Sequence, residues 1–300
     1  RWAEELIESA KAVDHRRLAQ LYAMAAQCYS TGRVDDALRF SDALHLAVES
    51  GRFDEVPFEF EALLGGTYVH LGEPERWAEL CRKMIEREPG AHPLTRSCLA
   101  IASTSAGADD EAISASEALL TIVNSTDNPL VACFTLLAYW FVRRHSAPLA
   151  AYEGLGRGLR IAHDSGNEWV ESQIAINLSR LAAIDRDPTD SFNFLVMSIR
   201  YYHDSGNVSL IRQPLAALAV FFDRLGYYEK AAIISGFAAT PLVHVTLPEF
   251  QDITAHLREV LGDEYESFAG AGKDMTNAQI VSYAFEQIDQ ARAELNAVSK

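Results

Sequence analysis

A pentapeptide that places histidine beside aspartate occurs twice in this chain, and such a pair can perform acid–base chemistry or bind a metal. The first copy is His163-Asp164-Ser165-Gly166-Asn167, and an identical copy follows 40 positions later, at 203–207. A catalytic or metal site would have to combine the two copies, because no third ligand lies at helical i+4 spacing near either one. The alternative is structural: each copy can end one helix and begin the next.

No other segment matches a common catalytic motif. The sequence contains no G-x-x-x-x-G-K-[ST] phosphate loop, no G-x-S-x-G serine turn and no H-E-x-x-H zinc helix. The four cysteines lie at least 17 positions apart, so neither C-x-x-C nor a zinc spacing occurs. We therefore expect a protein that is not an enzyme and that has no cofactor and no bound metal.

The pentapeptide fits the end of a helix. Apolar residues at helical spacing, such as Leu155, Leu159 and Ala162, precede the first copy. Gly166 and Gly206 can adopt the left-handed conformation that ends a helix. The preceding histidine can meet the last free carbonyls, and the following asparagine can cap the next helix. We predict that both glycines have positive φ at equivalent positions of two repeats.

Similar breaks recur along the chain with a period of about 39 residues. Two interleaved series of turn residues have spacings of 35 to 40 positions. The first series is Gly51, Gly90, Asp127, Gly166 and Gly206, and the second is Gly32, Gly72, Gly107, Ala147, Asp187 and Gly226. Two series with one period indicate two helices per repeat, each of about 15 residues. No sustained period-2 alternation occurs, so we expect essentially no sheet.

The predicted fold is all-α: a right-handed superhelical array of antiparallel helix pairs (a tetratricopeptide-like α-solenoid) with a helical C-terminal cap. Residues 1–240 form the array, and residues 241–300 form the cap. The chain starts in the middle of a repeat, so 1–13 is expected to be the second helix of a pair in a longer protein. Pairs are expected at 15–50, 55–89, 93–126, 129–165, 168–205 and 208–240. Pro214 falls inside a first helix, where we expect a delayed start or a kink.

The repeat pattern stops at about residue 240. We expect a loop at 242–248 and helices at 249–261 and around 264–268. Gly270-Ala271-Gly272 is expected to be a turn, followed by a last helix from 276 to about 297.

The charge balance excludes some classes of partner. The chain carries 26 basic and 42 acidic residues, a formal net charge of −16. This charge argues against sequence-independent nucleic-acid binding and against an anionic membrane surface. It favours solubility or, secondarily, a positively charged partner. No apolar run is long enough to span a membrane. The cysteines lie in apolar, helical contexts, which indicates reduced thiols and a cytoplasmic location.

Segments within the repeats resemble tetratricopeptide repeats. Gly32-Arg33-Val34-Asp35-Asp36-Ala37-Leu38 and Gly226-Tyr227-Tyr228-Glu229-Lys230-Ala231-Ala232 look like the turn and second-helix start of such repeats. The period departs from the standard 34 residues. Longer helices of this kind resemble the arrays of large bacterial signal-transduction ATPases.

The C-terminal part carries a more specific resemblance, over about 225–290. Its order of motifs is Leu225-Gly226, Ala231-Ala232, Gly236-Phe237-Ala238-Ala239, Leu261-Gly262, Met275-Thr276, Ile280-Val281 and Ala284-Phe285. This order resembles the end of the helical-repeat region in actinobacterial LuxR-type and adenylate-cyclase-like regulators that carry a STAND-class ATPase. In the family, Ala-Leu is usual where this chain has Ala284-Phe285. The resemblance implies that the array receives an inducer or partner protein and controls self-association.

Polar residues on the first helices are the predicted binding site. Gln173, Asn177 and Arg180 share one helical face at i, i+4 and i+7. Tyr139 and Arg143 end the preceding first helix, and Arg212 and Gln213 belong to the following one. Such a stripe can bind peptide backbone or carboxylates. The alternative is that these residues are simply an exposed helix face.

The sequence therefore predicts a non-catalytic regulatory interaction and sensor module of a bacterial transcriptional regulator. It is expected to bind a partner protein, a peptide or a small inducer on its concave face and to control self-association. Neither direct nucleic-acid binding nor membrane binding is expected. The alternative is a structural or dimerisation scaffold without a ligand.

Overall fold

The computed structural model describes residues 2–88, 90, 92–185 and 188–298. These residues form helices and turns, and no strand occurs among them, as predicted. The chain divides into two compact units, Arg1–Arg143 and Arg144–Lys300. The predicted pair 129–165 is therefore divided between the two units. The predicted break at Arg186-Asp187 lies outside the described residues.

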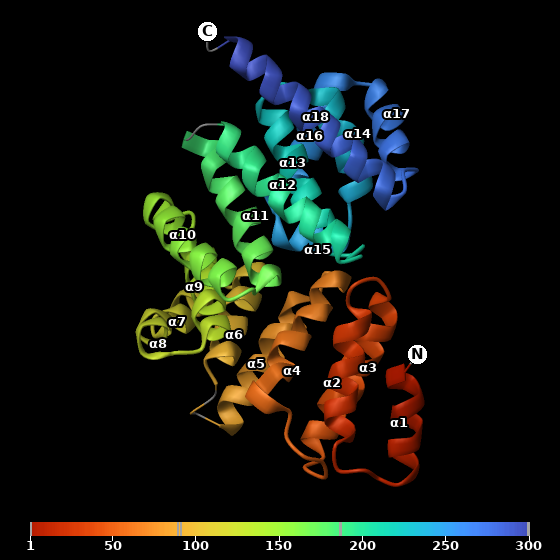
Figure 1. Cartoon of the computed structure of the whole chain (residues 1–300), viewed down its shortest axis with the longest axis vertical. Helices are drawn as coiled ribbons and strands as arrows, with labels where there is room; N and C mark the ends of the chain where they lie inside the picture. The colour runs from red at the N-terminus through yellow and green to blue at the C-terminus, as the bar shows by residue number, and fades with distance from the viewer. Residues whose placement is uncertain (1, 89, 91, 186–187, 299–300) are drawn as a thin grey trace. The chain divides into compact units, whose positions relative to one another are not determined.

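The first unit contains α-helices of 5 to 16 residues (Figure 1). Its α-helices are α1 (Trp2–Ala12), α2 (Leu18–Tyr29), α3 (Val34–Glu49), α4 (Phe60–Leu64), α5 (Pro74–Arg87), α6 (Pro93–Ser105), α7 (Asp109–Ser116), α8 (Leu119–Ser125) and α9 (Pro129–Arg143). Two 3-10 helices, η1 (Pro57–Glu59) and η2 (Gly65–Leu71), flank α4.

The described part of the second unit contains nine α-helices, which include the longest helix among the described residues, α18 (Figure 1). They are α10 (Pro148–Asp164), α11 (Glu168–Asp185), α12 (Pro188–Asp204), α13 (Arg212–Arg224), α14 (Tyr228–Ala238), α15 (Pro241–Thr246), α16 (Glu249–Leu261), α17 (Glu264–Lys273) and α18 (Asn277–Val298).

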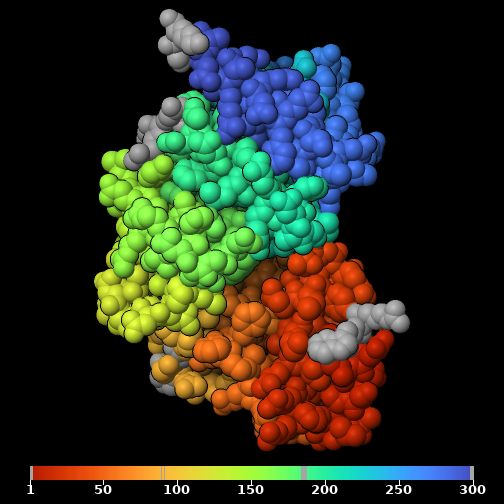
Figure 2. Space-filling model, in the orientation of Figure 1, coloured from red at the N-terminus to blue at the C-terminus, as the bar shows by residue number. Residues whose placement is uncertain are grey.

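Helices that follow one another in the chain pack against each other. Helix α2 packs on α3, α5 on α6, α10 on α11, α11 on α12, and α13 on α14. The contacts of α2 with α3, α11 with α12 and α13 with α14 confirm the predicted pairs 15–50, 168–205 and 208–240, whereas those of α5 with α6 and α10 with α11 join successive predicted pairs. The handedness of an array and its superhelical form stay predictions. In the second unit, buried residues of α12, α13, α14, α16 and α18 share one core that includes Phe192, Phe222, Phe250 and Ile288. Helix α18 lies over this core in contact with α12 and α14 (Figure 2).

The two pentapeptides end helices in the same way. The φ of Gly166 is 70° and that of Gly206 is 68°, as predicted. The amide of Asn167 donates to the carbonyl of Ala162 at 2.8 Å, and the amide of Asn207 donates to that of Tyr202 at 2.8 Å. These bonds satisfy carbonyls that the helix itself leaves free. The predicted equivalence of the two turns is therefore confirmed.

The side chains around these glycines depart in part from the prediction. His163 faces the carboxylate of Glu171, with 3.0 Å between Nδ1 and Oε1, instead of the last carbonyls of α10. The carbonyls are already occupied by the backbone amides of the turn. Asn207 accepts a bond from the amide of Leu210, as a cap should, whereas the side-chain amide of Asn167 donates to Ser165.

Two predicted helices of the first unit are interrupted. Between Pro57 and Leu71 the chain forms η1, α4 and η2 in place of one continuous helix. Phe58 and Glu59 have φ of 61° and 50°, which is unusual for residues with a side chain and breaks the helix there. The second helix of the 93–126 pair is likewise divided into α7 and α8.

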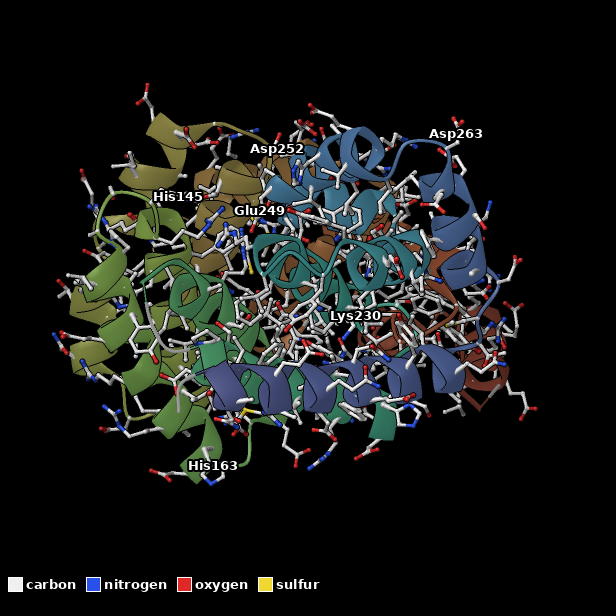
Figure 3. All side chains as sticks on the ribbon, turned by 90° about the horizontal axis from the view of Figure 1, so that it is seen from above. His145, His163, Lys230, Glu249, Asp252 and Asp263 are labelled. Carbon is white, nitrogen blue, oxygen red and sulfur yellow. The ribbon has the colours of Figure 1, made fainter. Side chains whose placement is uncertain are left out.

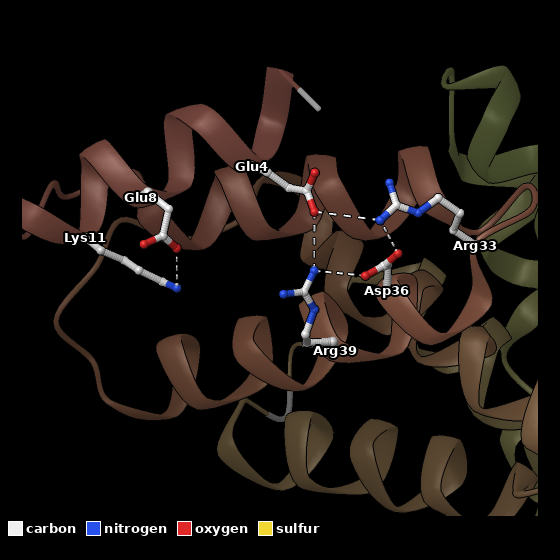
Figure 4. A network of polar contacts seen from close by, with 6 residues as sticks. All are labelled: Glu4, Glu8, Lys11, Arg33, Asp36 and Arg39. Atoms are coloured by element: carbon white, nitrogen blue, oxygen red, sulfur yellow. Dashed lines mark hydrogen bonds and ion pairs between the residues drawn. The ribbon is translucent and has the colours of Figure 1, made fainter.

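Helix α1 is held on the first pair by an exposed network of ion pairs (Figure 4). Glu4 of α1 lies 3.9 Å from Arg33 and 3.4 Å from Arg39, and both arginines also pair with Asp36. Because these groups are largely exposed, apolar burial of Ile7 contributes more to docking α1 than the charges do.

In the C-terminal region, α16 and α18 confirm the helices predicted at 249–261 and from 276 to about 297, whereas the predicted loop at 242–248 and the predicted turn at 270–272 are wrong. Residues 241–246 form helix α15 instead of a loop, with Pro241 at its first position, where proline is tolerated. The Gly270–Gly272 segment is not a turn, because α17 continues through it to Lys273. Helix α13 begins only at Arg212, which places Pro214 in its first turn and confirms the expected delayed start.

Glycines allow α14 and α17 to approach closely. A Cβ added to Gly236 would lie 2.0 Å from the carbonyl oxygen of Ala269, and one added to Gly272 would lie 1.7 Å from that of Ile233. No heavy atom lies within 4 Å of a Cβ built on Gly270. The glycines at 236 and 272 therefore permit backbone contact between two helices, which explains why Gly272 does not end α17.

We expect Gly272→Ala to lower the free energy of unfolding by at least about 2 kcal/mol, because a backbone carbonyl cannot move aside as a side chain can. Gly270→Ala is the matched control and should raise it by about 0.5 kcal/mol, since alanine favours the helix. Urea unfolding followed by circular dichroism measures both. Equal effects of the two substitutions would contradict the close contact.

Candidate functional site

The structure places the predicted site residues on three helices. Gln173, Asn177 and Arg180 lie on α11, and Arg212 and Gln213 begin α13, all in the second unit. Tyr139 and Arg143 lie near the end of α9 in the first unit, where the Arg143 guanidinium is 5.0 Å from the centre of the Tyr139 ring.

The side chains of Gln173 and Gln213 are in contact, as the predicted polar stripe across successive first helices requires. The side-chain amide of Gln173 donates to Oε1 of Gln213 at 3.0 Å and to the Tyr202 hydroxyl at 2.6 Å. Gln213 in turn donates to the hydroxyl of Thr246 on α15 at 3.1 Å. These contacts join α11, α12, α13 and α15 inside the second unit. Tyr202 is fully buried, so its hydroxyl depends on this bond.

Asn177 lies deeper than its type suggests, with only 6 % of its surface exposed. Its side-chain amide donates to the backbone carbonyl of Gln173 at 2.9 Å. Its Oδ1 atom is buried and has no hydrogen-bond partner among the described residues. This orphan acceptor destabilises the fold unless a donor reaches it.

Arg180 forms a two-point ion pair with Glu249, the first residue of α16. Nε lies 2.6 Å from Oε1, and the second contact, from a terminal nitrogen to Oε2, is 2.9 Å. The arginine side chain is 11 % exposed and the glutamate 25 %. Burial acts to raise the pKa of Glu249, but the charge and hydrogen bonds of Arg180, with a smaller contribution from Arg144, outweigh it and hold the pKa below its ordinary value.

Arg212 is half-buried and packs against α14. It donates a hydrogen bond to the backbone carbonyl of Phe237, and its guanidinium lies 4.4 Å from the centre of the Phe237 ring. Burial lowers the pKa of this guanidinium. Within the second unit, the predicted stripe thus makes much of its polar contact with the protein itself, and whether any member binds a guest stays a prediction.

Glu249, Tyr202 and Thr246 complete this polar cluster and were not predicted. Glu249 stands 69 positions after Arg180, and nothing in helical periodicity connects residues that far apart. Tyr202 lies on the buried face of α12, where its hydroxyl requires a partner.

An open groove of about 640 Å³ lies along α11 and α12. It is bounded by the first turn of α11 and by the last three turns of α12. Its lining residues are Glu168, Glu171, Ser172, Asn193, Val196, Met197, Arg200, Tyr201, Asp204 and Ser205. The second pentapeptide contributes Asp204 and Ser205, and the first directly precedes Glu168. The repeated motif therefore supplies part of this groove, which neither its interpretation as a helix end nor that as a catalytic or metal site predicted.

The groove is acidic at its rim and partly apolar along its wall. Glu168 and Asp204 are exposed, and Met197 is an exposed large apolar residue. Tyr201 is half-buried, and burial together with the charge of Glu168 raises its pKa. His163, which contacts Glu171, and Glu249 are well separated in Figure 3, so the groove and the Arg180–Glu249 pair are distinct sites.

A smaller groove in the first unit has a volume of about 360 Å³ and an almost entirely apolar lining. Met24 and Phe58 line it and are exposed. Among the described residues, no three His, Cys, Asp or Glu side chains are placed to hold a metal ion. Within that same part of the chain, no helix has both the length and the apolar character needed to cross a bilayer.

Glu249→Gln should lower the free energy of unfolding at pH 7 by about 2 kcal/mol, because it leaves the largely buried Arg180 charge without its partner. The exposed Arg258–Glu266 pair, 3.3 Å apart, provides the control: Glu266→Gln should change it by less than about 0.5 kcal/mol.

The same pair predicts a pH dependence. The pKa of Glu249 is lower in the folded chain than its ordinary value of 4.5. Its contribution to stability is therefore present above that value and is lost as the pH falls through the folded pKa. Between about pH 5 and 3, wild type should lose stability more steeply than Glu249→Gln in urea titrations. Parallel pH profiles would contradict the lowered pKa.

Comparison with known proteins does not assign the chain to a group. No protein-family model matches it, and no curated protein matches it significantly.

Proposed function

We propose that this chain is a regulatory interaction module whose second unit binds a peptide segment of a partner protein in the groove between α11 and α12. The wider assignment is a tetratricopeptide-like array from a bacterial LuxR-type or adenylate-cyclase-like regulator with a STAND-class ATPase, in which residues 241–300 form the cap. The order of motifs over about 225–290 supports this assignment, as do the helical pairs and their glycine turns.

The groove is the observation on which the proposal rests. Its volume of about 640 Å³ is in the range of binding clefts, and it combines exposed carboxylates with an exposed methionine and a tyrosine. The groove remains open to solvent, whereas Gln173, Asn177 and Arg180 already hydrogen-bond within the protein. A peptide can therefore bind in the groove without first breaking hydrogen bonds within the protein, as it would have to at the polar stripe.

A segment bound between α11 and α12 would act through the packing of these two helices. Helix α11 packs on both α10 and α12. A bound segment that favours one distance between α11 and α12 would therefore also shift the position of α11 against α10. The guest can shift that equilibrium only by its difference in affinity for the two arrangements. Control of self-association would follow from the same shift.

A scaffold without a ligand is the second candidate. The internal contacts of Gln173, Gln213 and Thr246 favour it, because side chains committed to the fold are what a rigid spacer needs. Two results together would support this candidate. Light scattering over a concentration series would show a dimer, and the peptide selection described next would enrich no peptide.

The test is selection of displayed random twelve-residue peptides on the immobilised whole chain. We expect enriched peptides whose binding falls at least about ten-fold on Met197→Trp, which fills the groove. Leu149→Trp is the control, since Leu149 is an exposed apolar residue of α10 that does not line the groove. Failure to enrich any peptide, or equal binding to both variants, would refute the proposal.

A further inference from the structure

We infer that the segment bound between α11 and α12 is basic, carrying lysine or arginine beside an apolar side chain. This inference rests on the proposed function and adds the chemistry of the partner. It follows from the charges that surround the groove, from its apolar wall, and from the chain as a whole.

Carboxylates dominate the charged lining. Glu168 and Glu171 belong to the first turn of α11, and Asp204 is the last residue of α12. Arg200 is the cation among the lining residues that the structure describes, and its guanidinium lies 5.9 Å from the centre of the Phe285 ring. Three carboxylates facing one guanidinium leave an excess of negative charge, which a positively charged side chain would balance.

The wall beside these carboxylates suits the body of a basic side chain. Tyr201 and Glu168 both line the groove. An ammonium or guanidinium group placed there can contact a carboxylate and the face of an aromatic ring together. Met197 and Val196 offer apolar contact for the stem of that side chain or for its neighbour.

The charge of the whole chain acts in the same direction. A net charge of −16 attracts a basic segment and repels acidic ones before contact. An acidic segment would also bring its carboxylates next to Glu168, Glu171 and Asp204. Charge complementarity therefore selects a basic protein segment as the occupant over an acidic one.

The experiment measures fluorescence polarisation of a labelled eight-residue peptide of alternating lysine and leucine on the whole chain at low salt. A peptide of alternating glutamate and leucine is the reference probe. We expect the lysine peptide to bind at least about ten-fold more tightly than the glutamate peptide. The combined substitution Glu168→Gln, Glu171→Gln and Asp204→Asn should remove most of that difference, because a single ion pair at a protein surface contributes a factor of about two to five.

Two controls separate the groove from the general charge. Asp263→Asn, together with Glu264→Gln and Glu259→Gln, removes the same number of charges from α16, α17 and the turn between them and should weaken binding less than about two-fold. Circular dichroism of each variant confirms folding. Equal losses in the two triple variants would overturn the inference, since they would show attraction by net charge alone.

Further outcomes distinguish the occupant. If spermidine displaces the lysine peptide at equal concentration, the inference is overturned in favour of a free polyamine. If the Met197→Ala variant binds the lysine peptide with unchanged affinity, the inference is overturned as well, because the apolar contact is then absent. Enrichment of acidic or neutral peptides in the groove would overturn the basic partner while leaving the proposed function intact. Failure of the peptide selection itself would instead refute the proposed function.

Discussion

Reversal of the chain at the end of each helix is the constraint on which the rest of this structure depends. An amphipathic helix buries its apolar face only if the next helix returns directly along it, within a turn of a few residues. The turns at Gly166 and Gly206 meet this requirement with a left-handed glycine and a backbone bond from the following amide. Gly72, Gly107 and Gly226 also have positive φ, at comparable positions. Pairs such as α11 with α12 follow from these turns.

The polar residues of the second unit divide into two groups with different consequences. Gln173, Gln213 and Arg180 connect helices within the core side of the unit, where a polar group needs a partner. Glu168 and Asp204 stand at helix ends beside an open groove, where water keeps them charged and accessible. Charge available to a partner therefore lies at the ends of the helices, close to the turns that define the repeat.

The accuracy of sequence-based prediction differed with the range of the interactions involved. The turns at Gly166 and Gly206 were predictable because their hydrogen bonds join residues five positions apart. Gly272 was misassigned to a turn because a glycine that admits a distant backbone has the same local signature as one that ends a helix. The break at Phe58 was missed because it has no local signal: neither Phe58 nor Glu59 favours the left-handed region that both occupy. In the candidate site, the face shared by Gln173 and Asn177 was predictable, and the ion pair of Arg180 with Glu249 was not.

The sequence by itself determined that the chain is helical, where most helices begin and end, and that the chain is strongly acidic. These properties depend on periodicity, on proline and glycine positions, and on composition, all of which act within a few residues. Only the tertiary structure decided which helices meet through bare backbone, which polar side chains neutralise one another, and where a groove remains open. Those outcomes depend on contacts between residues tens of positions apart, such as Gly236 with Ala269 or Arg180 with Glu249, and local sequence does not encode such distances.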